Sequence, residues 1–187
     1  MTYNEMKKKY LSLIEELNPN SEQLTDDPDI AAKQVEVTNQ VMYELARMKK
    51  IAKYAEMEVT AGDLVTFEDI GKAVGYDVYQ LGTICGVNHT YKADGTVLKI
   101  LESGTLEIDC YVYPERITEK TKDTAYEFEL SADALEIMPY GIAADLLKSD
   151  VSTEYGAVYA NRYETMLQRF DPRNHMTSIY IDGGVNI

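Results

Sequence analysis

Residues 131–173 read SADALEIMPYGIAADLLKSDVSTEYGAVYANRYETMLQRFDPR, and this stretch predicts two helices joined by a short corner. Apolar side chains recur at steps of three and four in the first helix and form one stripe: Leu135, Met138, Ile142 and Leu146. The second helix carries a stripe that is largely aromatic: Tyr155, Tyr159, Tyr163, Met166, Leu167 and Phe170. Asp171-Pro172 ends this helix. Two antiparallel helices cannot cover both stripes by themselves, so we expect the rest of the chain or a neighbouring chain to cover them.

Local signals set the limits of the two predicted helices. Ser131 is a suitable N-cap for the first helix, and Ser152 is a suitable N-cap for the second. Pro139 predicts either a kink in the first helix or a start of its main segment at that residue. Gly141 is small, which allows another helix to approach closely.

The helical pattern also appears near the start of the chain and then gives way to strands. Residues 4–17 and 29–50 have helical spacing of apolar side chains. From about Met57 the residues are β-branched or aromatic and separated by turn signals, which predicts strands at 58–66, 76–87, 96–101 and 105–113. In the last of these, Leu106, Ile108, Cys110 and Val112 alternate with polar or tyrosine side chains, so we expect a half-buried strand. Residues 115–126 are charged and predict an exposed connection back to the helices.

These elements together predict an α+β fold. We expect a helical bundle domain formed by residues 1–56 and 127–172, with a small antiparallel β-subdomain inserted at residues 57–126. Residues 173–187 form an extended C-terminal arm in this prediction. The arm holds a five-residue strand pattern at 177–181, and a strand that short needs the edge of another sheet. We therefore expect Ile179 and Ile181 to contact a neighbouring subunit.

The composition limits the possible functions. The 187 residues suffice for one sizeable core, or for a core with a small inserted subdomain. The 32 acidic and 18 basic residues give a formal charge of −14, which argues against an electrostatic grip on nucleic acid. It does not exclude DNA passing nearby, because an acidic wall repels DNA. No charged and then apolar leader opens the sequence, and no apolar run reaches transmembrane length, so we expect folding in a cytoplasm without a membrane contact.

Candidate catalytic residues are few. His89 and His175 are the only histidines, and they are distant in sequence from each other and from Cys85 and Cys110. The chain lacks the spaced His and Cys clusters of metal sites and the glycine-rich loops that bind phosphates. We therefore predict a protein that is not an enzyme and that has no catalytic residues, no cofactor and no metal ion.

Tyrosine dominates the aromatic residues. The chain has 15 tyrosines, three phenylalanines and no tryptophan. Tyrosine combines contact area with a polar tip, which suits a subunit interface as well as the border of a small core. Because each tyrosine of the stripe carries a hydroxyl group, we interpret the stripe as part of an interface, with these candidate residues: Tyr155, Tyr159, Tyr163 and Phe170.

The helix pair resembles the C-terminal half of head–tail connector proteins, the neck adaptors of tailed bacteriophages. The resemblance covers about residues 130–173. It depends on an alanine-rich helix with the pattern P-Y-x-x-A-x-x-L-L and a following helix with Y-x-x-x-Y-x-x-x-L. The matching residues are Pro139, Tyr140, Ala143, Leu146, Leu147, Tyr159, Tyr163 and Leu167.

This resemblance implies a structural virion protein in the neck of a phage or prophage particle, assembled in the cytoplasm of a bacterial host. It implies a ring, commonly a dodecamer, between the portal protein and a tail-side neck or stopper protein. DNA would pass through the lumen without sequence-specific binding. Two alternatives remain open: another phage tail-completion or baseplate structural protein, and a small ligand-binding protein or enzyme.

Overall fold

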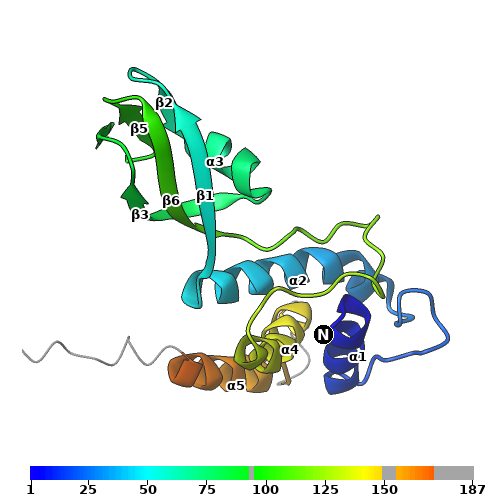
Figure 1. Cartoon of the computed structure of the whole chain (residues 1–187). Helices are drawn as coiled ribbons and strands as arrows, with labels where there is room; N and C mark the ends of the chain where they lie inside the picture. The colour runs from blue at the N-terminus through cyan, green and yellow to red at the C-terminus, as the bar shows by residue number, and fades with distance from the viewer. Residues whose placement is uncertain (93–94, 149–154, 171–187) are drawn as a thin grey trace, which may run out of the picture.

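The chain has a helical part and a β part, seen at the bottom and the top of Figure 1. This computed structural model describes residues 1–92, 95–148 and 155–170. The helical part consists of α1 (Tyr3–Leu13), α2 (Pro28–Met48), α4 (Ala132–Leu147) and α5 (Tyr155–Phe170). The β part lies between α2 and α4 in the sequence and consists of β1 (Ile51–Val59), β2 (Leu64–Thr66), α3 (Phe67–Val74), β3 (Val78–Cys85), β4 (His89–Tyr91), β5 (Val97–Ile100) and β6 (Gly104–Val112).

Two antiparallel sheets form the β part. One sheet has the strand order β1-β6-β3, and the other has the order β2-β5-β4. The inner side chains of both sheets and of α3 form one apolar cluster, whose completely buried members include Ile70, Ile100, Leu106 and Ile108. The alternation predicted for the last strand is confirmed, because Leu106, Ile108, Cys110 and Val112 of β6 have no exposed surface.

The predicted fold class, a helical bundle with one small inserted β-subdomain, is wrong. The described residues form an α+β structure with five helices and two three-stranded antiparallel sheets, and one helix, α3, lies inside the β part. Eight residues are too few to show a strong helical period, so α3 was not expected. Its ends nevertheless carry signals: Thr66 and Asp69 form a capping box, and Gly75 ends the helix with a left-handed φ of 77°. The predicted C-terminal arm, residues 173–187, lies outside the described residues.

The first strand begins earlier than the sequence pattern indicated. The second helix ends at Met48, and β1 starts at Ile51, six residues before Met57. The sequence IAKYAEMEV of β1 contains two alanines, two glutamates and a lysine, which favour helices, and this composition obscures the alternation of its side chains. Pairing along the whole of β6 holds these residues in a strand.

The core of the helical part contains buried polar groups. Tyr10 donates a hydrogen bond of 3.0 Å to Gln34 Oε1, and Gln34 Nε2 donates one of 2.9 Å to Gln23 Oε1. Lys7 is 2% exposed and forms an ion pair of 2.8 Å with Asp123. These bonds tie α1 to α2 and to the connection that precedes α4.

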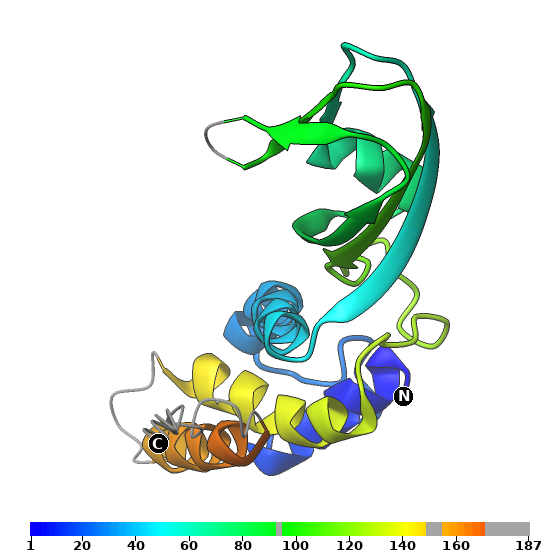
Figure 2. The ribbon, with the colours of Figure 1, turned by 60° about the vertical axis from the view of Figure 1, so that its left-hand side comes forward.

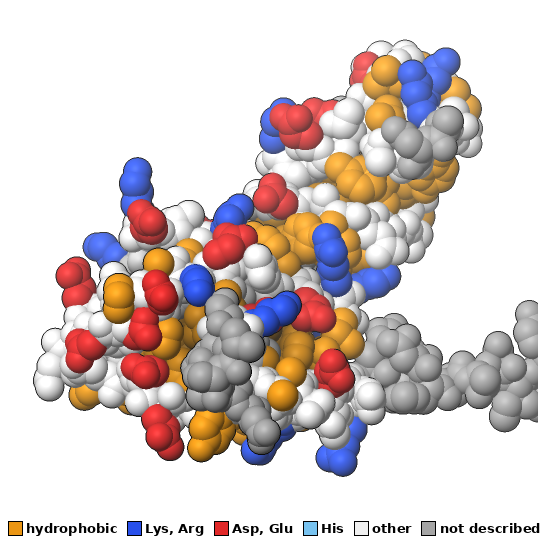
Figure 3. Space-filling model, turned by 180° about the vertical axis from the view of Figure 1, so that it is seen from behind, with side chains coloured by type: hydrophobic (Ala, Val, Ile, Leu, Met, Phe, Trp, Pro, Cys, Tyr) orange, Lys and Arg blue, Asp and Glu red, His pale blue; other side chains and the backbone are white. Residues whose placement is uncertain are grey.

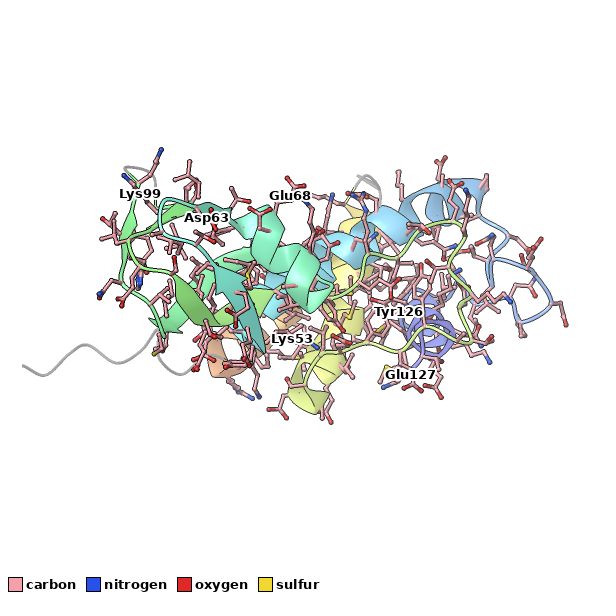
Figure 4. All side chains as sticks on the ribbon, turned by 45° about the horizontal axis from the view of Figure 1, so that its top comes forward. Lys53, Asp63, Glu68, Lys99, Tyr126 and Glu127 are labelled. Atoms are coloured by element: carbon pink, nitrogen blue, oxygen red, sulfur yellow. The ribbon has the colours of Figure 1, made fainter. Side chains whose placement is uncertain are left out.

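The connection between β6 and α4 is anchored, although it was expected to be exposed. Ile117 is 1% exposed, and its backbone N–H and C=O both bond to the side chain of Asn39, at 2.9 and 2.8 Å. Farther along, Tyr3 donates its backbone N–H to Tyr126 O, and a single β-bridge joins Thr2 to Glu127. Figure 4 shows Tyr126 and Glu127 beside α1. The connection thus closes the helical core.

A stack of three tyrosines joins the two parts. The ring of Tyr113 lies 4.7 Å from Tyr43 of α2 on one side and 4.7 Å from Tyr79 of β3 on the other. Arg47 donates a hydrogen bond to the hydroxyl of Tyr113, and the hydroxyl of Tyr79 donates one to Ala46 O. Figure 2 shows the β part rising from the end of α2.

Candidate functional site

The helix pair α4–α5 is the candidate site, because it carries most of the residues that the sequence pattern singled out. Ser131 caps α4, as predicted, by accepting a hydrogen bond of 3.4 Å from the backbone of Ala134. The helix α4 is continuous from Ala132 to Leu147 and includes Pro139. Most of its side chains are buried against α1, α2 and α5. The corner at residues 149–154, including the predicted cap Ser152, lies outside the described residues.

Gly141 allows the two helices to approach closely, as its small size suggested. A Cβ atom at this position would lie 2.7 Å from Cε2 and 2.9 Å from Cζ of Tyr163, and 3.0 Å from Cγ1 of Val41. These separations are shorter than van der Waals contact. The ring of Tyr163 therefore occupies the space that any larger residue at position 141 would require.

Tyr163 is part of the protein's own helical core. Its ring packs against the buried cluster of α1, α2 and α4, and its hydroxyl donates a hydrogen bond of 2.8 Å to Glu44 Oε2 on α2. Burial raises the pKa of Tyr163 far above its ordinary value, and the hydrogen bond and negative charge of Glu44 raise it further. The hydroxyl is thus fixed as a donor at any physiological pH.

Tyr159 and Phe170 also contact the chain's own helices. The hydroxyl of Tyr159 donates a hydrogen bond to Leu13 O at the end of α1. The ring of Phe170 packs against the helical core, with Lys49 Nζ 5.4 Å from its centroid. Three of the six predicted interface residues are therefore half-buried within the subunit.

Tyr155 differs from the other members of the stripe. Its side chain is 65% exposed, and that of Val158, three residues later, is 57% exposed. Both lie on the first turn of α5, and Tyr155 also lines a groove at the end of α4. Val158 was not among the predicted interface residues, although the steps from Tyr155 to Val158 and on to Arg162 follow helical spacing and define a second face.

The predicted interface residues thus fall into three groups. Tyr159, Tyr163 and Phe170 cover the subunit's own core, and Tyr155 is left on the surface. Ile179 and Ile181 lie outside the described residues. The shared role of the predicted residues in an interface stays a prediction, and the exposed Tyr155, together with the exposed Val158 outside the stripe, is open to a partner.

A groove lies at the end of the helix pair where α4 ends and α5 begins. Its volume is about 610 Å³, and its lining combines apolar and aromatic side chains with four carboxylates and one lysine: Leu13, Ile14, Ile30, Leu146, Leu147, Tyr155, Tyr159, Glu15, Glu16, Asp27, Asp29 and Lys33. Asp27 also caps α2 by accepting hydrogen bonds from the backbone N–H groups of Asp29 and Ile30. Seen from behind, acidic side chains gather on the helical part (Figure 3). Such a rim repels phosphate groups, so nucleic acid is a poor occupant of this groove.

The described residues bring no metal-binding chemistry together. Within them, no group of three or more His, Cys, Asp and Glu side chains is arranged to hold a metal ion. His89 lies in β4, with Nδ1 3.1 Å from Val87 O, and its ring meets Tyr91 edge to face. Cys110 is buried in the β core and Cys85 is exposed, and both are free thiols.

Comparisons with known proteins do not assign the chain to a family. No family model matches the chain, and no curated protein matches it. Among the helices of the described residues, none combines the length and the apolar character needed to cross a membrane.

Proposed function

We propose that this chain is a structural subunit of the head–tail connector of a tailed phage or prophage particle. In this proposal the subunits form a ring, typically a dodecamer, between the portal protein and a tail-side neck or stopper protein. DNA passes through the ring without sequence-specific binding. The protein has its place in the neck of the virion, after assembly in the cytoplasm of a bacterial host.

The proposal depends mainly on one observation: the residues that match the connector pattern pack the helices α4 and α5 together and against α1 and α2. Pro139, Ala143 and Leu146 are buried in α4, while Tyr159 and Tyr163 bond to α1 and α2. These residues fix one compact pair, and the same pair presents Tyr155 and Val158 to the outside. Exposed aromatic and aliphatic side chains on a rigid helix suit a protein contact.

The charge of the molecule also supports a conduit role. The formal charge of −14 reflects an excess of carboxylates, which repel a phosphate backbone. A ring through which DNA slides needs an inner surface that does not bind DNA phosphates tightly. The two-part shape supports the proposal as well, because the helical part and the β part offer two different surfaces to partners (Figure 1).

Negative-stain electron microscopy of the purified chain tests the proposal, with and without the portal protein encoded in the same phage or prophage genome. We expect a closed ring seated on the portal. A chain that stays monomeric in both samples and leaves the portal bare would contradict it.

A double variant with a control on the same helix tests the exposed face at the start of α5. Replacing Tyr155 and Val158 together by serine should leave the melting temperature nearly unchanged and weaken portal binding, because truncating central interface residues costs about 2 kcal/mol or more. Thr165→Ser on the same helix, an exposed position outside this pair, is the control and should leave both properties as in the wild type. Equal portal binding by the double variant and the wild type would remove this face from the interface.

A further inference from the structure

A second groove lies between α1, α4 and α5, and its character is basic. Its volume is about 610 Å³. Apolar or aromatic side chains form most of its lining: Leu13, Leu17, Pro139, Tyr140 and Met166. Lys8 and Lys9 line it from α1, and Glu136 is its one acidic residue. Arg162 adds a third cation, since its guanidinium group lies 4.3 Å from the ring centroid of Tyr140.

The two lysines of this groove are open to a partner. Lys8 and Lys9 are exposed, and neither forms an ion pair with another residue that the structure describes. In a chain with 18 basic and 32 acidic residues, three cations around one apolar groove form a local excess of positive charge. The groove therefore suits an acidic surface that also carries an apolar or aromatic side chain.

The outer face of the sheet β1-β6-β3 has that character. Four carboxylates lie on it, and strand pairing sets Glu56 directly opposite Glu107 and Tyr54 opposite Asp109. The fourth, Glu58, accepts a hydrogen bond of 2.7 Å from Thr105. No ion pair involves any of the four within the described part of the chain.

Two features of this face favour a cationic partner. Like charges that lie directly opposite each other across two strands destabilise a sheet, and Glu56 and Glu107 form such a pair. Neighbouring cations would remove that cost. Tyr54, which is 56% exposed among the carboxylates, supplies an aromatic ring that suits an apolar floor.

The sheet face and the groove of one subunit are kept apart. The helix α2 lies between the β part and the helices that form the groove (Figure 1). A contact between the two surfaces therefore joins two subunits. It is heterologous, because each subunit contributes a different surface, and repetition of such a contact closes a ring when the rotation between subunits allows it.

We infer that the basic groove between α1, α4 and α5 binds the acidic outer face of sheet β1-β6-β3 of the next copy of this chain. The inference rests on the proposed ring and identifies the two surfaces that form it. Lys8 and Lys9 face the carboxylates of Glu56 and Glu107 in this contact, and the ring of Tyr54 meets the apolar floor.

Charge reversal with rescue tests the contact. One variant carries Lys8→Glu and Lys9→Glu, a second carries Glu56→Lys and Glu107→Lys, and a third carries all four changes. Self-association is measured by sedimentation velocity, and ring formation is measured on the portal protein. We expect each two-residue variant to weaken self-association at least about tenfold and the four-residue variant to recover most of it. Raising the salt concentration should weaken the wild-type contact, since exposed charges are screened.

Matched controls reverse the same amount of charge elsewhere. Lys120→Glu with Lys122→Glu, and Glu22→Lys with Glu119→Lys, change exposed residues outside both surfaces and should assemble as the wild type does. Melting temperatures identify any variant that fails to fold. If folded charge-reversal variants still form rings on the portal as the wild type does, the docking contact is wrong and the proposed function stands. A four-residue variant that folds but does not recover also contradicts the contact. If the wild type forms no ring, both proposals fail.

Discussion

The helical part and the β part are stabilised by different kinds of interaction. All five of the buried polar or charged residues found in the described chain belong to the helical part or to the loop within it: Lys7, Thr25, Gln34, Thr38 and Asn39. The buried cluster of the β part is apolar throughout, with its carboxylates on the outside. Burial of apolar surface is non-directional, whereas buried polar groups require specific partners. The β core thus depends on the alternation of apolar side chains, whereas the helical core combines a larger apolar cluster with directional hydrogen bonds.

The largest effect should come from a cavity in the β core. Ile108 of β6 has no exposed surface, so Ile108→Ala should lower the free energy of unfolding by about 4 kcal/mol. The control is Glu107→Ala, at the exposed neighbouring position on the same strand, which should change the free energy of unfolding by less than about 1 kcal/mol. Urea denaturation measures both. Hydrogen exchange should show the loss of protection mainly in β1, β3 and β6, and equal losses in α1 and α2 would contradict separate stabilisation of the two cores.

The corresponding change in the helical part removes a hydrogen-bonding side chain. Asn39→Ala leaves the buried N–H and C=O groups of Ile117 without their partner, and we expect a loss of about 3 kcal/mol. Its exposed neighbour provides the control Gln40→Ala, which should have little effect. Denaturant midpoints compare the two. A loss as small as that of the control would show that directional bonds do not hold this core.

A smaller loss is expected where the two helices of the pair meet. Alanine is favoured over glycine inside a helix, yet Gly141→Ala should destabilise by about 2 kcal/mol, because the added Cβ collides with the ring of Tyr163. Tyr163→Leu replaces the ring by a smaller aliphatic side chain, so it should cost less in the Gly141→Ala background than in the wild type. A double-mutant cycle on melting temperatures measures this coupling, and strict additivity would rule out the collision.

The smallest effect concerns a cap in the β part. Hydrogen bonds from the Thr66 side chain and backbone lower the pKa of Asp69 below its ordinary value of 3.8. The cap therefore stabilises the fold above that pH, and its contribution is lost as the pH falls through the lower folded-state value. Urea midpoints of the wild type should fall more than those of Asp69→Asn between pH 5 and pH 2.5. Identical pH profiles would assign no role to this carboxylate.

The comparison between the two parts also explains what could be predicted from sequence. The strand β6 could be located to within one residue at each end, because its alternation reflects burial on one face. The helix α2 was similarly clear, with an expected range of 29–50 and an observed range of Pro28–Met48. Both elements are long and periodic, and periodicity is a local property of the sequence.

The remaining features depend on contacts between distant residues. Burial of Ile117 results from its bonds to Asn39, 78 residues earlier in the chain, and no local pattern indicates that partnership. The aromatic stripe of α5 has one spacing but two environments, since Tyr163 reaches Glu44 while Tyr155 is left exposed. Which tyrosine covers the core depends on where α2 lies. Helical spacing alone does not contain that information.

Native mass spectrometry of the chain mixed with the portal protein of the same genome tests the central claim most directly. We expect one complex whose mass equals that of the portal plus a fixed whole number of copies of this chain, and the number should stay the same at different excesses of the chain. Binding without a fixed number of copies, or a portal that carries none, would contradict a connector ring.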